Sequence, residues 1–255
     1  MKKIAYIFIF LFSGILFAQK KDFAFDKGEW LKYRIHYGII NAGYASLTVD
    51  EVEDQEKDLF YFKGKGWTTG MANWFFKVRD TYESKVDKKS QLPVHFIRRV
   101  DEGGYTINRD TYFDHKNRIA RIVDHKNKTK NEVAVSNVQD MISAFYSLRN
   151  EQIDSLKIGE SIGLDMFFDA EKFPFKLKYL GKETLSTKFG KVNCYKLRPL
   201  VQSGRVFKAE ESLTLWVSSD ANKIPIRIKA SLAVGSIKVD LHEYKGLSHP
   251  FHIIL

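Results

Sequence analysis

Apolar and polar residues alternate along several short stretches of this 255-residue chain. Between Leu31 and Tyr37, apolar residues occupy the odd positions and basic residues the even ones. Residues 45–49 repeat this alternation after a turn that contains glycine. A period of two places one side-chain set on a buried face and the other in water. The two stretches therefore predict an antiparallel β-hairpin near the start of the chain.

Similar runs, rich in β-branched and aromatic residues and separated by Gly, Asn and Asp, continue almost to the end of the chain. They predict strands at residues 59–67, 80–86, 94–100, 105–113, 118–123, 132–135, 164–168, 175–179, 192–200, 213–217, 226–228 and 237–241. Short strands at such spacing are typical of sandwiches and barrels. We expect a mainly β fold with an antiparallel, curved or barrel-like sheet.

The tetrapeptide Asp-His-Lys-Asn occurs twice, at residues 114–117 and 124–127. Both copies lie between runs with strand character. Asp and Asn side chains form turns by hydrogen bonding to their own backbone. The repeated tetrapeptide therefore predicts two successive hairpin turns rather than a repeat protein.

Two segments favour helix. Asn137–Asn150 has apolar residues at helical spacing, and Ser136 with Gln139 matches the Ser-x-x-Gln capping box. We expect this central helix to pack on the sheet or to link two halves of it. The dense apolar patch Met71–Phe76 predicts a short helical cover over one end of the sheet. With Trp67 nearby, the same patch could instead form a lid over a ligand cavity.

The first eighteen residues have the pattern of a secretory signal peptide. Lys2 and Lys3 precede the apolar run Ile4–Phe12, and Ala18 provides a small residue before a predicted cleavage site. The apolar run is shorter than the ~20 residues of a membrane span. No cysteine follows it to accept a lipid. We expect export without a transmembrane span in the mature chain, to the periplasm or, alternatively, to the medium.

Residues 19–255 are expected to form one exported β-rich domain. This length suits one large β domain or two smaller ones. The central helix divides it into two strand-rich halves, residues 19–135 and 151–255, which we expect to share one sheet system.

The chain is basic, with a formal net charge of +10. A basic surface can attract anionic headgroups or acidic polysaccharide, or can simply be the solvated face of a sheet. Nucleic acid is excluded as a partner because no recognition module is present and an exported chain meets little nucleic acid.

Cys194 is the only cysteine, so no intramolecular disulfide can form. Its position in a strand predicts a buried structural thiol.

The aromatic residues are the candidates for binding. Trp67, Trp74, Phe75 and Trp216 could line a groove for lipid or glycan, although such residues more often form the core of a β domain.

Acidic residues at the ends of predicted elements are candidate polar anchors, namely Asp80, Asp140 and Asp220. Asp220 is the most enzyme-like because it lies in a turn between strands, yet the same turn needs Asp for its own hydrogen bonds. No spacing identifies a general acid and base pair.

His115 and His125 are surface turn residues rather than metal ligands, and no metal, nucleotide or serine-hydrolase motif is present. We expect no cofactor and no metal.

Four separated motifs resemble the bacterial family called domain of unknown function 3108. They are Tyr33–Ala45, Gln139–Arg149, Leu213–Lys229 and Val234–Ile237, in the order that the family shows. The resemblance covers nearly all of the mature chain. It implies an exported, β-rich protein without an established activity, and it provides no catalytic residues to transfer.

Two looser likenesses concern the leader and the architecture. The leader ending Leu-Phe-Ala-Gln resembles exported proteins of Bacteroidota. The predicted architecture is similar to periplasmic lipoprotein carriers, whose half-open barrels hold acyl chains. This second likeness concerns the fold alone.

Three hypotheses follow. The first is a non-catalytic envelope protein that binds or carries an apolar or amphipathic ligand such as a lipid or glycolipid, or assists envelope assembly; it predicts a dry, elongated cavity. The second is a hydrolase of envelope glycan or lipid with Asp220 or Asp80 as the acid, which predicts a cleft with two close carboxylates of perturbed pKa. The third is a scaffold for an envelope protein partner, which predicts a large apolar surface patch without a cavity.

Overall fold

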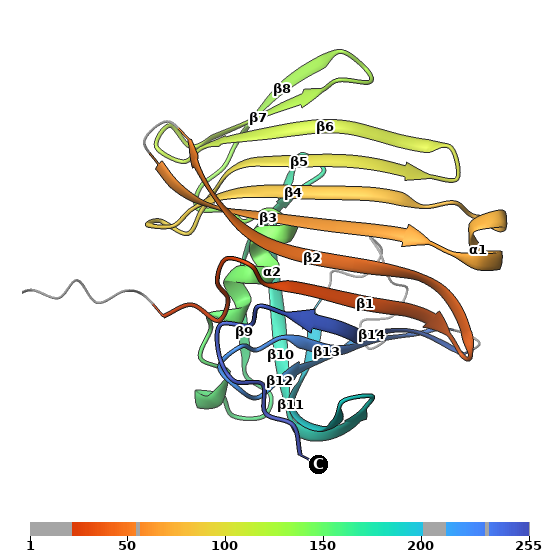
Figure 1. The fold of residues 1–255 in the computed structure, drawn as a ribbon. Coiled ribbons are helices and arrows are strands. Elements are labelled where there is room, and N and C mark those ends of the chain that lie inside the picture. The colour runs from red at the N-terminus through yellow and green to blue at the C-terminus, as the bar shows by residue number, and fades with distance from the viewer. Residues whose placement is uncertain (1–21, 55–56, 201–212, 233–234, 255) are drawn as a thin grey trace, which may run out of the picture.

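The computed structural model describes residues 22–54, 57–200, 213–232 and 235–254. The predicted signal peptide and Val234 of the fourth motif lie outside the described residues. Fourteen strands form one antiparallel sheet, which is curved and does not close into a barrel (Figure 1). The mainly β, antiparallel and curved fold predicted from the sequence is confirmed.

The strands, in chain order, are β1 (Trp30–Tyr37), β2 (Ile40–Asp54), β3 (Lys57–Thr68), β4 (Arg79–Asp87), β5 (Pro93–Glu102), β6 (Tyr105–Asp114), β7 (Ile119–Asp124), β8 (Thr129–Ala134), β9 (Ser161–Phe168), β10 (Glu171–Thr187), β11 (Gly190–Leu200), β12 (Leu213–Ser218), β13 (Pro225–Ser231) and β14 (Ser236–Lys245). The helices are α1 (Gly70–Phe75), α2 (Met141–Arg149) and the 3-10 helix η1 (Ile153–Ser155).

The order of strands in the sheet places the first strand in the middle. The chain runs outward from β1 through successive hairpins to β8, and returns from β9 to β14, which pairs with β1. The two ends of the sheet are therefore β8 and β9. Helix α2 connects them and contacts β3, β4 and β9. Because these strands come from opposite halves of the sheet, α2 lies inside its curve (Figure 1).

Aromatic packing fixes α2 against the first half of the sheet. The ring of Tyr146 stacks on that of Phe62 in β3, with 3.9 Å between ring centroids and 12° between planes. Phe25, which precedes β1, meets both rings edge-on. Gly64 permits the close approach, because a Cβ atom at that position would lie 3.1 Å from Cδ1 of Ile142.

The start of the central helix differs from the prediction. The helix begins at Met141 with Asp140 as its N-cap, and the capping box pairs Asp140 with Ser143. Ser136 and Gln139 do not cap it. The backbone of Gln139 instead bridges to β9, since its N–H donates to Asp165 and its carbonyl accepts from Phe167, both at 2.8 Å. Because the N–H and carbonyl groups of Gln139 are both hydrogen bonded to β9, they are not available for the first turn of the helix.

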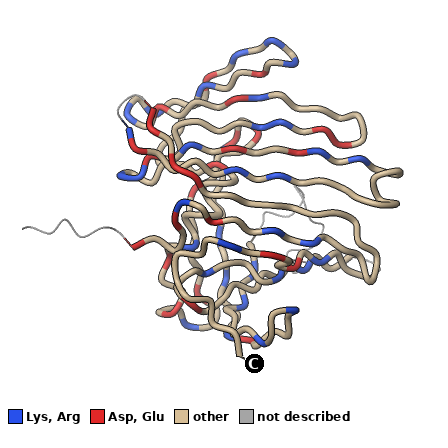
Figure 2. The backbone as a smooth tube through the Cα atoms, in the orientation of Figure 1, with Lys and Arg blue, Asp and Glu red and all other residues tan. Residues whose placement is uncertain are grey.

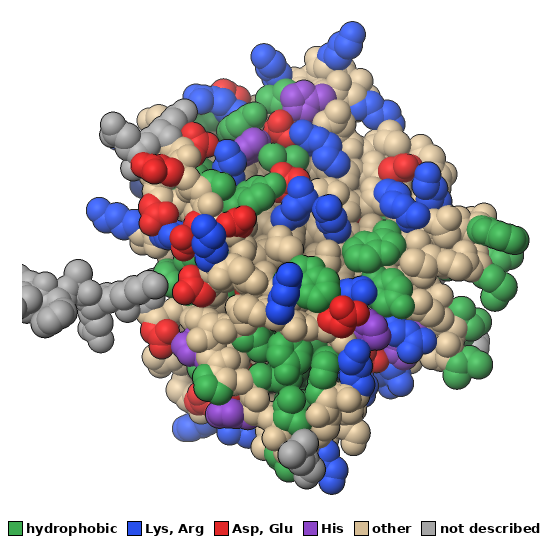
Figure 3. Space-filling model, viewed as in Figure 1, with side chains coloured by type: hydrophobic (Ala, Val, Ile, Leu, Met, Phe, Trp, Pro, Cys, Tyr) green, Lys and Arg blue, Asp and Glu red, His purple; other side chains and the backbone are tan. Residues whose placement is uncertain are grey.

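The predicted short helix at Met71–Phe76 is present as α1, but it does not cover a core. None of its residues is buried. Trp74 and Phe75 are 88% and 87% exposed. Figure 3 shows hydrophobic side chains projecting from the edge of the molecule where α1 lies. The dense apolar patch is therefore a surface feature.

The two Asp-His-Lys-Asn segments form the predicted hairpin turns, between β6 and β7 and between β7 and β8. In both, the Asp carboxylate accepts from the Asn backbone N–H three residues later, at 3.0 Å and 2.9 Å.

Basic residues are distributed along the strands of both halves instead of forming one cluster (Figure 2). Many meet an acidic residue on the neighbouring strand, such as Lys32 with Glu243 at 3.0 Å and Lys63 with Glu83 at 2.7 Å. Cross-strand pairs of this kind are typical of a solvated sheet face.

A buried ion pair joins segments that are far apart in the chain. The guanidinium of Arg149, at the end of α2, donates to both carboxylate oxygens of Glu29 at 2.6 Å and 2.7 Å. Both side chains are almost completely buried. The same guanidinium donates to the carbonyls of Ala24 and Asn222. One side chain thus connects the N-terminal segment, β1, α2 and the β12–β13 turn.

We predict that Glu29→Ala strongly destabilises the fold, because it leaves the Arg149 charge buried without its partner. Removing one member of a buried pair costs roughly 3–5 kcal/mol. The free energy of unfolding from urea titrations would measure this loss. The matched control is Glu132→Ala, which removes an ion pair with Arg121 whose side chains are 54% and 60% exposed. That control should change stability by about 1 kcal/mol or less. Equal effects of the two variants would contradict the prediction.

Candidate functional site

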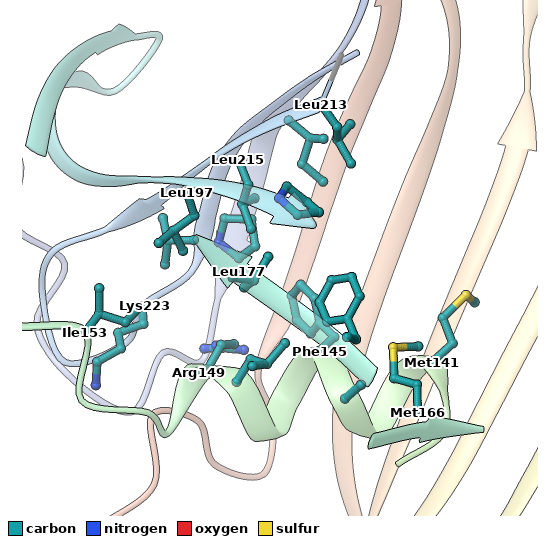
Figure 4. A pocket seen from close by; sticks show the side chains of 17 residues that line it. Met141, Phe145, Arg149, Ile153, Met166, Leu177, Leu197, Leu213, Leu215 and Lys223 are labelled. Carbon is teal, nitrogen blue, oxygen red and sulfur yellow. The ribbon is translucent and has the colours of Figure 1, made fainter. Parts of the chain in front are cut away.

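An apolar cavity of about 270 Å³ lies between α2 and the strands of the second half of the sheet (Figure 4). The space is partly open to solvent, so it is a pocket that a ligand can enter and not a closed void in the core. Fifteen of its seventeen lining residues are apolar, and the other two are Arg149 and Lys223.

The periodicities of helix and strand place these side chains in the cavity. On α2, Met141, Phe145 and Leu148 recur at helical spacing and line one side. On β12, alternate residues point into the space, including Leu213 and Leu215. Strands β9, β10, β11 and β13 contribute the remaining walls. Figure 4 shows the side chains of α2 and β12 facing one another across the space.

The two charged lining residues differ in what they can offer a ligand. The guanidinium of Arg149 is already bonded to Glu29 and to backbone carbonyls. Lys223, in the β12–β13 turn, is half-buried, and its amino group makes no ion pair within the described part of the chain. Figure 4 shows it beside Ile153 at one end of the cavity, with Leu213 toward the other. Lys223 is thus the lining cation that remains available.

The four aromatic residues proposed from the sequence as groove candidates do not line this cavity. Trp216 is buried in β12, next to the lining residue Leu215 but on the opposite face of the strand. Its indole N–H donates to Glu183 at 3.2 Å. Trp67 lies near the end of β3, 6.0 Å from the ring of Tyr44. Trp74 and Phe75 are the exposed residues of α1.

Asp220 has a structural role in the β12–β13 turn. One carboxylate oxygen accepts from the Ser218 hydroxyl at 2.9 Å and from the Asn222 backbone at 3.0 Å, and the other accepts from the His252 backbone at 3.3 Å. These bonds match the turn role proposed for Asp220 from the sequence. Three further pockets lie beside Arg98, Tyr146 and His95, and with the apolar cavity they are the pockets described here. The Asp220 side chain is buried and lines none of them.

Asp80 forms a carboxyl pair with Glu102. Burial, followed by the hydrogen bond between Asp80 and Glu102, raises the pKa of Asp80 to about 6. The Asp80 carboxylate also accepts from the backbone N–H of Asp101 at 3.2 Å. A pair of carboxyl groups that share a proton can be catalytic or structural. Asp80 and Glu102 line none of the described pockets.

Asp140 is the most deeply buried of the three candidate anchors. Its carboxylate accepts from the backbone of Ile142 and Ser143, both at 2.8 Å, and from the Ser84 hydroxyl of β4 at 2.6 Å. Burial raises its pKa to about 6, although these hydrogen bonds act in the opposite direction. Asp140 therefore caps α2 and binds it to the sheet.

Metal ligation or thiol chemistry would be another basis for a site. Among the described residues, no group of His, Cys, Asp and Glu is arranged to hold a metal ion. Cys194 is buried, and burial raises the pKa of its thiol to about 12, so it stays protonated at neutral pH. Within the described ranges, no helix has the length and apolar character needed to span a bilayer.

A family model described as a protein of unknown function (DUF3108) matches residues 32–242. The chain belongs to the DUF3108 family. No curated protein sequence matches it. This DUF3108 chain is similar in fold to a "beta-barrel-like protein of domain of unknown function DUF1849" from Brucella abortus. The TM-score is 0.59 at 9% identity, and the match covers 86% of this chain and 98% of the other.

Two further solved structures match less closely. One is described as a "putative exported protein with YmcC-like fold" from Bacteroides fragilis, with a TM-score of 0.35, 9% identity and coverage of 88% and 98%. The other is described as a "putative lipoprotein" from Parabacteroides distasonis, with a TM-score of 0.33, 13% identity and coverage of 88% and 98%. Because both of these TM-scores are below 0.5, only the first similarity bears on the fold.

We predict that Asp140→Asn changes how the stability of this DUF3108 protein depends on pH. In the folded state the pKa of Asp140 is about 6, against ~3.9 in an unfolded chain. Between these values the folded state binds more protons, so the contribution of Asp140 to stability is fully present below about pH 4 and is lost as the pH rises through 6. Asn retains an acceptor for the helix N-terminus without the buried charge.

Urea titrations of both proteins between pH 4 and pH 7 would test this expectation. The difference in unfolding free energy should move in favour of Asn by on the order of 2–3 kcal/mol as the pH rises. Comparing the two proteins at each pH removes the contributions of the other carboxylates. A difference that does not change with pH would contradict the raised pKa.

Proposed function

We propose that this DUF3108 protein is a non-catalytic envelope protein that holds an apolar chain of an amphipathic ligand, such as a lipid, in the cavity beside α2. The observation that supports the proposal is the apolar lining of that cavity. Export rests on the leader sequence, and a periplasmic location is part of the proposal.

The volume of the cavity favours a single hydrocarbon chain. Pockets for drug-sized ligands span roughly 300–1,000 Å³, so 270 Å³ lies just below that range. Each buried methylene contributes about 0.8 kcal/mol. Eight buried methylenes would thus contribute roughly 6 kcal/mol before the costs of ordering the ligand. This is enough for measurable binding by a fatty-acid tail, whereas a complete two-chain lipid exceeds the space.

The position of Lys223 supports a ligand with an anionic end. Its aliphatic stem lines one end of the apolar space, and its charge is not engaged in an ion pair within the described chain. A carboxylate or phosphate would complement that charge, while the tail would occupy the space toward Leu213. The proposed ligand class is therefore an anionic amphiphile with one buried chain.

We predict that Ala144→Phe abolishes binding by filling the cavity. Ala144 is buried on α2 and lines the space, and Phe is tolerated in a helix. A fluorescent fatty acid titrated into the mature protein should bind with at least tenfold lower affinity to the variant. The control is Ala221→Phe, the same change at an exposed position in the β12–β13 turn. Wild-type protein that does not bind, or equal binding by Ala144→Phe, would overturn the proposal.

We also predict that Lys223→Gln discriminates between head groups. The variant should bind a fatty acid up to about fivefold more weakly, because a partly exposed ion pair contributes roughly 1 kcal/mol or less. Its affinity for the fatty alcohol of the same length should equal that of the wild type. Isothermal titration with both ligands would measure this, and equal losses for acid and alcohol would exclude a charge contact.

A second candidate function, hydrolysis of envelope glycan or lipid, is supported by the carboxyl pair of Asp80 and Glu102. The pair lacks an adjoining cleft among the described pockets. If the pair were catalytic, Asp80→Asn would stop turnover of an envelope substrate while leaving fatty-acid binding intact. The apolar cavity makes the binding function the better supported of the two.

A further inference from the structure

Exposed apolar side chains are concentrated at one end of the sheet. Ten of the fourteen large apolar residues that are exposed in the described chain come from α1 and the residue after it, the β1–β2, β5–β6 and β13–β14 turns, and the strand ends beside them. The most exposed are Ile39 at 95%, Trp74 at 88% and Phe75 at 87%. Single exposed apolar residues need no explanation, but a collection of them does.

These segments form one continuous rim. The backbone N–H of Thr69, before α1, donates to the carbonyl of Ala42 near the start of β2. The ring of Phe76, after α1, lies so close to Gly103 of the β5–β6 turn that a Cβ atom there would be 2.6 Å from it. On the other side, Gly235 of the β13–β14 turn is in similarly close contact with Tyr37. Figure 3 shows hydrophobic side chains projecting along this edge.

Basic residues lie next to the apolar rim, on the strands and the segment that flank α1. Lys65 of β3, Lys77 after α1 and Arg79 of β4 are exposed, and none of them makes an ion pair within the described chain. The side chain of Arg79 donates to the backbone carbonyls of Thr68 and Val78. Acidic residues also occur at this end, including Asp101 and the Glu102 that pairs with Asp80.

We propose that this rim docks on a lipid bilayer, with the side chains of α1 and the β1–β2 turn inserted among the acyl chains and Lys65, Lys77 and Arg79 against anionic headgroups. Apolar and aromatic residues backed by cations are the combination that binds membrane interfaces. A second copy of the chain fits this rim less well. In a two-fold contact the same surface faces itself, which would bring the unpaired cations together.

The strand register connects the rim to the cavity. Leu213, which lines the cavity, pairs with Ala230, which pairs with Ile237. Ile237 pairs with the rim residue Tyr37. These steps place the Leu213 end of the cavity at the same end of the sheet as the rim, three strands away from Tyr37 and beside the strand that leads to the β13–β14 turn. Docking would therefore turn that end of the cavity toward the membrane, although docking itself does not require that the cavity holds a lipid.

Vesicle binding tests the proposal directly. The mature protein is mixed with vesicles of phosphatidylethanolamine and phosphatidylglycerol, and the bound fraction is measured by flotation. We expect the double variant Trp74→Ser/Phe75→Ser to bind at least tenfold more weakly. Both residues are exposed, so the thermal midpoint should stay unchanged. The control is Ile158→Ser, a residue that is 75% exposed in the loop between η1 and β9, and it should bind like the wild type.

Two further measurements identify what the rim contacts. Vesicles with brominated acyl chains should quench the fluorescence of Trp74, and that quenching should disappear in Trp74→Phe. The pair Lys77→Gln/Arg79→Gln should bind these anionic vesicles severalfold more weakly, and the loss should shrink at high salt and with neutral phosphatidylcholine.

Three results would overturn the proposal. One is that the wild type fails to bind either kind of vesicle. Another is that the double variant binds as well as the wild type. The third is a concentration-dependent dimer in sedimentation, lost in the double variant, which would assign the rim to a second copy. Ala144→Phe separates this test from that of the proposed function, since it should lose fatty-acid binding and keep vesicle binding.

Discussion

The buried ion pair of Arg149 and Glu29 holds together parts of the chain that the sheet alone does not connect. Arg149 ends the helix that links the two edges of the sheet, and Glu29 precedes the central strand. The carbonyl of Asn222 adds the β12–β13 turn to the same guanidinium. Because an unpaired buried charge is strongly unfavourable, these segments can only assemble together. At the other end of α2, Asp140 bonds to Ser84 and fixes the helix to β4.

A helix fixed at both ends explains why a cavity can persist beside it. Apolar voids normally shrink as neighbouring elements move inward, and their cost depends on how well the site can collapse. Here the stacking of Tyr146 on Phe62 and the two polar anchors hold α2 toward the first half of the sheet. The opposite face of the helix is turned toward the second half of the sheet, across the cavity. The space between them is the one that we propose a ligand fills.

Local sequence patterns predicted the strands well, because alternation is a property of each strand alone. Each of the fourteen predicted strand segments overlaps an observed strand, and the two Asp-His-Lys-Asn turns are present. The helix start was wrong because the backbone of Gln139 pairs with β9, a contact between distant segments. The cavity was missed for the same reason. Its walls are mostly ordinary aliphatic residues from seven elements, whereas the conspicuous Trp residues lie elsewhere.

The pairing of the first strand with the last has a kinetic consequence. β1 lies in the middle of the sheet and is paired on one side by its neighbour β2, but its other partner, β14, is separated from it by almost the whole chain. Closing so long a loop is slow relative to forming hairpins. During synthesis, the pairing of β1 with β14 in the middle of the sheet cannot form until β14, the last strand, has left the ribosome. A chain with this order of strands remains incomplete until its last strand is made, which would suit the export that we propose for this protein.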